Sequence, residues 1–192
     1  LLAVVRALQG RTTGKHGILF LNHSLGGGTQ SYQDAQIKKR SIEERIYSAT
    51  VLADGRTFVV YEHISNDEIK GKEIARFDYR MMKKEEYKNL LSALAIDEIF
   101  FNHLLGFRLP EFLFWNEECG VSYKVFLHDF YCVCPHYTLI NDKGVYCCAE
   151  KDQKVCSACL KNEILAVSKD IYDWRMMMKK FLLNATFIMT PS

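Results

Sequence analysis

Short apolar runs alternate with segments of helical periodicity along most of the chain. The first run, GILFLNH at residues 17–23, is apolar until its last two positions, as in a central buried strand, and a glycine loop, SLGGGT, follows it. A helix is expected from Thr29 to about Arg40. Such alternation of strands and helices is typical of an α/β domain with a mostly parallel sheet flanked by helices.

The same patterning predicts the remaining elements. Further strands are expected at residues 45–54, 56–62, 73–79, 97–103, 122–129 and 185–190. The first two flank Asp54-Gly55, a strong turn dipeptide, and it stays open whether they pair as a hairpin. Helices are expected where apolar residues recur every three or four positions, at 87–94, near 110–118 and from Ile164 to Phe181.

Length and composition fit one folded domain. The chain has 192 residues, of which 48% are hydrophobic and 25% charged, and it contains no apolar run long enough to cross a membrane. Residues 1–16 are expected to form a preceding helix or linker, and residues 17–192 the domain itself. Between about 130 and 160 the periodicity breaks, which indicates a structured Cys-rich insertion. Both ends look cut, so we expect a piece of a longer protein.

Charge and cysteine usage narrow the class of protein. The 25 basic and 23 acidic residues are scattered, giving a net charge of +2 without the basic stripe that nucleic-acid binding requires. The seven cysteines are an odd number, and no secretory signal opens the chain. We therefore expect a reducing, cytoplasmic compartment and no nucleic-acid partner.

The glycine loop is the first candidate for binding. Gly26, Gly27 and Gly28 lie between a buried strand and a helix, where backbone amides and the helix N-terminus can hold an anion such as a diphosphate. The loop is neither G-x-G-x-x-G nor a Walker loop. A tight turn that needs glycine for positive φ explains it equally well.

Three histidines each end a predicted strand. Because ligands bind beyond the carboxyl ends of strands in open parallel sheets, His23, His103 and His128 are expected near a substrate. For His23 a hydrogen bond to a neighbouring loop is an equal alternative. His128 is the strongest candidate, since its imidazole could bond a substrate hydroxyl or stabilise developing charge. Asp129 could accept a substrate hydroxyl, although a loop cap is slightly preferred.

The cysteines suggest a structural metal. Cys156 and Cys159 have the spacing of a ligand pair, and Cys134 and Cys147 could complete a four-thiolate zinc site. The overall spacing is not that of a standard zinc finger. Free or disulfide-forming thiols are therefore a close alternative.

A cysteine nucleophile is another interpretation of the same segment. Cys132 or Cys134 would attack, with His128 or His136 as the base. Several cysteines within one irregular segment suit scaffolding better than catalysis, and no oxyanion-stabilising element is evident beside them. Cys132, expected on the opposite face of the extended segment from Cys134, and Cys148, the neighbour of Cys147, are left out of the metal site.

Five stretches follow one another along the chain: ILFLNHSLGGGTQSY, FFNHLLGF, VFLHDFYCVCP, a G-x-YC segment and CSAC. Together they resemble the amino-terminal domain of family-4-like glycosyltransferases with the GT-B fold. The resemblance covers roughly residues 17–192, and its most specific part is LHDFYCVCP followed by the spaced cysteines. That pattern is found in bacterial members that build surface polysaccharides.

The resemblance implies one half of a GT-B fold, a Rossmann-like domain that holds the acceptor. The whole enzyme would move a sugar, with retention, from a nucleotide-sugar donor to a glycan or lipid-linked acceptor. Its donor-binding domain would follow Pro191-Ser192 and is absent from this sequence, so the chain alone should be inactive. Peripheral association with the inner face of the membrane would suit such acceptors.

Roles for single residues follow from the same resemblance. Gly26, Gly27 and Gly28 would approach the donor diphosphate, His128 would contact the transferred sugar, and His103 is a weaker carry-over. No metal would be required for the chemistry, so any zinc would be structural, and no protein nucleophile is expected. Thr29-Gln30-Ser31 departs from related chains, which often carry a charged residue after the loop.

A rival from another class is a non-catalytic Rossmann-like binding module with a metal-stapled Cys lobe. The sequence that follows residue 192 in the gene distinguishes the two. A second α/β domain with an E-x7-E motif would favour the enzyme, and its absence would favour the module.

Overall fold

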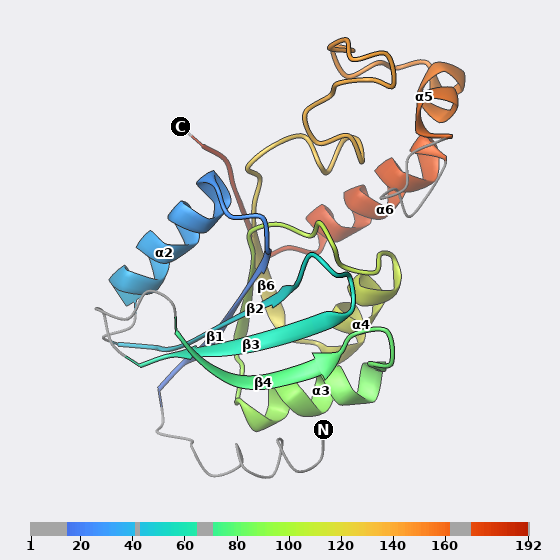
Figure 1. The fold of residues 1–192 in the computed structure, drawn as a ribbon. Coiled ribbons are helices and arrows are strands. Elements are labelled where there is room, and N and C mark those ends of the chain that lie inside the picture. Colours follow the sequence, from blue (N-terminus) through green and yellow to red (C-terminus); the bar gives the residue numbers. More distant parts are fainter. Residues whose placement is uncertain (1–14, 41–42, 65–70, 162–169, 192) are drawn as a thin grey trace.

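The protein is an α/β domain built on one mixed, mostly parallel sheet of seven strands (Figure 1). The computed structural model describes residues 15–40, 43–64, 71–161 and 170–191. The strands are β1 (Gly17–His23), β2 (Arg45–Val51), β3 (Thr57–His63), β4 (Lys72–Asp78), β5 (Glu98–Phe101), β6 (Ser122–Phe126) and β7 (Phe187–Met189). The helices are α2 (Gly28–Arg40), α3 (Lys84–Ala93), α4 (Glu111–Cys119), α5 (Gln153–Leu160) and α6 (Ile171–Leu183).

The strand order is β4-β3-β2-β1-β5-β6-β7. Strand β1 pairs in parallel with both β2 and β5, and β6 and β7 continue the parallel part. The antiparallel part consists of β2, β3 and β4. The hairpin that the sequence left open is thus present, and Asp54 closes its turn by accepting hydrogen bonds from the backbone of Arg56 and Thr57.

Helices cover the two faces of the sheet unequally. On one face α2 packs over a small cluster that includes Phe20, Phe100 and Phe126. The other face carries the main core, in which side chains of α3, α4 and α6 such as Tyr87 and Trp174 are fully buried. In Figure 1, α2 lies on one side of the sheet and α3 and α4 lie on the opposite side.

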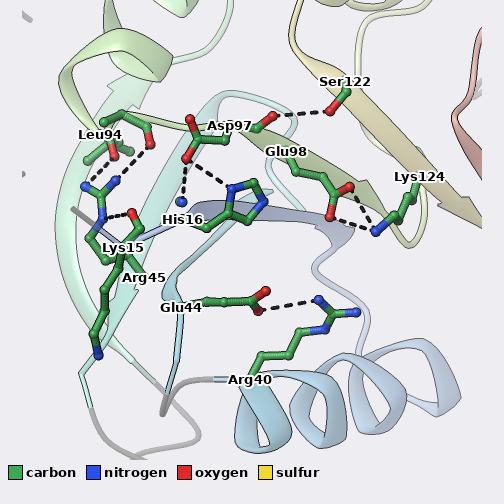
Figure 2. A network of polar contacts seen from close by, with 12 residues as sticks. Lys15, His16, Arg40, Glu44, Arg45, Leu94, Asp97, Glu98, Ser122 and Lys124 are labelled. Carbon is green, nitrogen blue, oxygen red and sulfur yellow. Dashed lines mark hydrogen bonds and ion pairs between the residues drawn. The ribbon is translucent and has the colours of Figure 1, made fainter. Parts of the chain in front are cut away.

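Polar contacts tie the strands together at their amino ends (Figure 2). The guanidinium of Arg45 donates to the carbonyl oxygens of Leu94 and Ala95, at 3.2 and 3.1 Å. Asp97 accepts the Gly17 N–H at 2.8 Å, which links β1 to the start of β5. Such contacts fix this end of the sheet, whereas His23, His103 and His128 lie at or just beyond the carboxyl ends of β1, β5 and β6.

The elements agree with the sequence pattern except at certain ends. The strands expected at 97–103 and 122–129 stop at Phe101 and Phe126, because the chain turns there before it reaches the histidines. The insertion expected at 130–160 is irregular up to α5, a helix that the pattern did not predict. Residues 1–14 and 162–169, with the expected leading helix and the start of the last helix, lie outside the described residues.

None of the helices in the described ranges has both the length and the apolar character that are needed to cross a membrane.

Candidate functional site

The order of the strands reverses at β1. From β1 the chain passes through α2 to β2 on one side, and it later reaches β5 on the other side. In open α/β sheets such a switch point leaves a crevice at the carboxyl ends of the two central strands. The rings of His23, at the end of β1, and His103, after β5, lie 4.7 Å apart there. The structure thus brings together two of the three predicted histidines at the position where this fold binds ligands.

His23 holds the glycine loop in place. Its Nδ1 accepts the Leu25 N–H at 3.2 Å, so the ring proton lies on Nε2, which donates to Thr29 Oγ1 at 3.1 Å. The Thr29 hydroxyl in turn donates to the carbonyl oxygen of Gly26 at 3.3 Å. Burial and the nearby His103 ring lower the pKa of His23. The contacts of His23 are therefore those of the alternative in which this histidine forms hydrogen bonds with a neighbouring loop.

The three glycines of the loop differ in backbone conformation. Gly26 and Gly27 have φ values of 75° and 79°, which L side chains rarely adopt. Gly28, the first residue of α2, has no such φ, and among the described residues no atom beyond its chain neighbours and the helix backbone lies within 4 Å of the position that a Cβ would take. The tight turn accounts for Gly26 and Gly27 only. At Gly28 the missing side chain leaves the N-terminus of α2 open to approach.

His103 is a buried positioning residue. It is 6% exposed, and its Nδ1 accepts the Leu105 N–H at 3.0 Å, which places the ring proton on Nε2. That Nε2 donates to Asp129 Oδ2 at 3.0 Å. Both nitrogens are therefore engaged within the protein, and a direct bond from His103 to a substrate would require one of these contacts to break.

Asp129 has the contacts of a loop cap. Its Oδ1 accepts the Tyr131 N–H at 2.9 Å while Oδ2 accepts the bond from His103. Burial alone would raise the pKa of this carboxyl, but these hydrogen bonds and the His103 ring outweigh it and lower the pKa. Asp129 thus joins the end of β6 to the end of β5.

His128 has an unsatisfied ring nitrogen. Its Nε2 is buried without a hydrogen-bond partner among the described residues. The ring packs on Phe126 at 4.2 Å and meets the edge of Tyr32 at 5.4 Å, so it bridges β6 and α2. Burial, aided by His103, lowers the pKa of His128 to about 4. The imidazole is neutral at pH 7, and an unpaired buried nitrogen is stabilised by any ligand that bonds to it.

A small cavity of about 20 Å³ lies between these groups. His103, His128 and Asp129 contribute to its wall, together with Tyr131 and Cys132. It is large enough for a single water-sized group. The polar side chains beyond β5 and β6 therefore surround one shared space.

Two cysteines of the predicted zinc site, Cys156 and Cys159, lie on α5, and Cys134 and Cys147 come from the irregular segment before it. Burial is the main cause that raises the pKa of Cys134 to about 11, and the charges of Cys147, Cys156 and Cys159 raise it further. The Asp142 N–H lies 3.4 Å from Cys159 Sγ, a contact that suits a thiolate ligand. In the part of the chain that the structure describes, however, no three His, Cys, Asp or Glu side chains are arranged to hold a metal ion. The residue types fit zinc, but the described side chains are not arranged around a common metal position.

The cysteine-nucleophile alternative finds no support in the thiol environments. Burial raises the pKa of Cys132 to about 12, and the neighbouring Asp129 raises it further. Cys134 is likewise shifted upward. Because the thiolate is the reactive form, both residues are poor nucleophiles at neutral pH.

Three residues of the site were not singled out from the sequence. Thr29 and Tyr32, one helical turn apart on α2, contact His23 and His128, and Tyr131 stacks near His103 with ring centroids 4.8 Å apart. The spacing of three between Thr29 and Tyr32 was a usable signal, because residues so spaced share a helix face.

Comparisons of the chain with protein-family models, with curated proteins and with solved structures found no match.

Proposed function

We propose that this chain is the amino-terminal, Rossmann-like domain of a retaining glycosyltransferase with the GT-B fold, and that it holds the acceptor. One observation carries the proposal: α2 starts at an open glycine, Gly28, after the central strand β1, and Tyr32 on the next turn of this helix contacts the unsatisfied His128. The resemblance of the LHDFYCVCP and glycine-loop sequences to family-4-like enzymes supports the same function.

Each residue then has a distinct task. The first amides of α2, left accessible at Gly28, would face the donor diphosphate and stabilise the charge on the leaving nucleotide. The buried Nε2 of His128 would bond a hydroxyl of the transferred sugar. His23 and His103 act through other groups, one on the glycine loop and one on Asp129, so both are positioning residues.

The surroundings of the reaction follow from this assignment. A nucleotide sugar would be shared with a second domain, and the acceptor would be a glycan or a lipid-linked glycan of surface polysaccharide synthesis. We place the enzyme in the cytoplasm, with peripheral contact to the inner face of the membrane. Zinc, if bound by the cysteines, would be structural.

The test is turnover by the protein together with the sequence that follows Ser192 in its gene. His128→Ala should lower kcat about a hundredfold, as loss of one preorganised transition-state contact does, and leave the circular dichroism spectrum unchanged. His16→Ala is the matched control, because His16 lies at the amino ends of the strands beside Asp97 and should not affect turnover. Equal rates in the two variants would remove His128 from the reaction.

The binding-module alternative predicts no turnover in the same assay. If no second α/β domain follows residue 192, neither variant affects turnover, because there is none. The gene sequence therefore separates the two functions before any enzyme is assayed.

A further inference from the structure

A cavity lined mostly by polar residues lies on the face of the sheet that α2 only partly covers. It has a volume of about 560 Å³, within the range of small-molecule sites, and its wall comes from β1, the first turns of α2, β2 and β3. His23 and Ser24 contribute to its rim, so the cavity adjoins the glycine loop.

The wall of this cavity, which we call the α2 cavity, is polar but almost uncharged. Asn22, Gln33, Ser48 and His63 are each less than 9% exposed, although burying polar groups costs free energy unless they are bonded. Among the described residues that line the cavity, Asp34 is the one carboxylate, and there is no Lys or Arg. A phosphorylated or carboxylated ligand would find no cation here, whereas hydroxyl groups would find both donors and acceptors.

Asn22, in the wall of the cavity, has a donor that a ligand could use. Its side chain is 2% exposed, and Oδ1 accepts the His23 N–H at 2.9 Å. The amide nitrogen Nδ2 is buried without a hydrogen-bond partner among the described residues. An unpaired buried donor is destabilising, and a ligand oxygen bound at this wall would pair it.

Asp34 of α2 and Tyr61 of β3 contribute a carboxylate and an aromatic ring to the cavity wall. Asp34 is half-buried, and Gln30 Nε2 donates to its Oδ1 at 2.7 Å, which fixes the carboxylate as an acceptor. The half-buried ring of Tyr61 follows a register shift between Val60 and Tyr61 in the pairing of β3 with β4. Such irregularities redirect side chains, often beside binding sites. Because a sugar ring has a hydroxyl edge and an apolar face, a carboxylate acceptor and an aromatic ring in the wall of one cavity suit it.

From these contacts we infer that the α2 cavity binds an uncharged sugar residue. Asn22 donates to one hydroxyl oxygen, Asp34 accepts from another hydroxyl, and Tyr61 packs on the apolar face of the ring. That this sugar is the acceptor rests on the proposed function. Gln33 connects the cavity to the switch point, since its Oε1 accepts the Asn102 amide at 3.1 Å.

The experiment measures binding of methyl glycosides of glucose, galactose, mannose and N-acetylglucosamine to the protein by saturation-transfer NMR, with glucose 1-phosphate as the charged probe. At least one neutral glycoside should bind, and more tightly than glucose 1-phosphate. Tyr61→Ala and Asp34→Asn should each weaken its binding about tenfold, as loss of one stacking or charge-assisted contact does. Tyr172→Ala and Asp173→Asn, matched changes at exposed positions of α6, should leave it unchanged.

Absence of binding by every neutral glycoside, tighter binding of glucose 1-phosphate, or equal affinity in all four variants would overturn the inference. The outcome is separate from that of the proposed function. Turnover of a nucleotide sugar without glycoside binding would reject the cavity alone. Glycoside binding by a protein without turnover would keep the cavity and reject the enzyme.

Discussion

Two residues at the carboxyl ends of the strands show how a single atom decides a role. His23 and His128 are both imidazoles beside the switch point, but His23 has a partner at each nitrogen and His128 Nε2 has none among the described residues. The sequence predicted that both histidines lie near this edge, because a residue that follows a buried strand lies at the carboxyl end of that strand. Which of them is available to a ligand depends on loop contacts that no periodicity encodes.

The titration of His128 tests its environment directly. Burial and the neighbouring His103 lower its pKa to about 4, from a usual value of 6.5. NMR titration of the ring protons should give a value near 4. A pKa at or above 6 would show that the ring is solvated, and it would contradict the unsatisfied, buried Nε2.

The same shift predicts how stability depends on pH. As the pH falls from about 6.5 to about 4, the unfolded chain protonates His128 before the folded protein does, so this residue makes the fold less stable across that window. Gln cannot be protonated. Chemical denaturation of His128→Gln should therefore show a smaller loss of stability between pH 7 and pH 4.5 than the unsubstituted protein. An identical loss in both would contradict the prediction.

Gly28 offers a functional prediction with little structural cost. A methyl group at this position meets no atom within 4 Å and no forbidden φ, so Gly28→Ala should keep its stability within about 0.5 kcal/mol. If the donor diphosphate approaches this helix end, the variant should raise KM for the nucleotide sugar about tenfold, the effect of losing one good hydrogen bond. Unchanged KM would mean that the glycine loop does not contact the donor.

At the scale of elements, strong patterns predicted the structure well and local contacts set the boundaries. The 3–4 spacing of Tyr87, Leu90 and Leu91 identified α3, and all three are buried. Helix α5 was missed because its eight residues are too few for a periodic signal. Its start was nevertheless marked by Asp152, whose side chain accepts the Lys154 N–H at 2.8 Å as an N-cap.

Strand β1 depends on glycine at its first position. A Cβ on Gly17 would lie 2.2 Å from the carbonyl oxygen of Ala95, which is backbone and cannot move aside cheaply. Gly17→Ala should lower the free energy of unfolding by about 3 kcal/mol, the upper end of typical overpacking costs. Urea denaturation, with Gly28→Ala as the matched control, measures the difference. Equal stability of the two variants would refute the close contact.

The Cys-rich segment has its own test, because the residue types fit zinc while the described side chains do not close around an ion. Protein purified in reducing buffer without chelators should contain about one zinc per chain, since binding would draw the four thiolates together. Cys156→Ser should lose the metal, whereas Cys119→Ser, on α4 outside the set, should retain it. Zinc-free protein under these conditions would leave the cysteines as free thiols or a disulfide.

For the molecule as a whole, the sequence predicted an α/β domain with a mostly parallel sheet, and the structure confirms that class. It did not predict the strand order, because order depends on which edges pair, and the apolar pattern of β1 fits any central position. That order is what creates the switch point and brings His23 against His103. The α2 cavity could not be predicted from the sequence either, because its walls come from three strands and one helix that are separate in the chain.

The central claim is that this domain belongs to a glycosyltransferase. The most direct measurement is release of nucleoside diphosphate from a panel of nucleotide sugars by the protein together with the sequence that follows Ser192, with the glycosylated product identified by mass spectrometry. We predict turnover of at least one donor, with the anomeric configuration retained and a strong loss in His128→Ala. An intact second domain that turns over no donor, or turnover that His128→Ala leaves unchanged, would contradict the account.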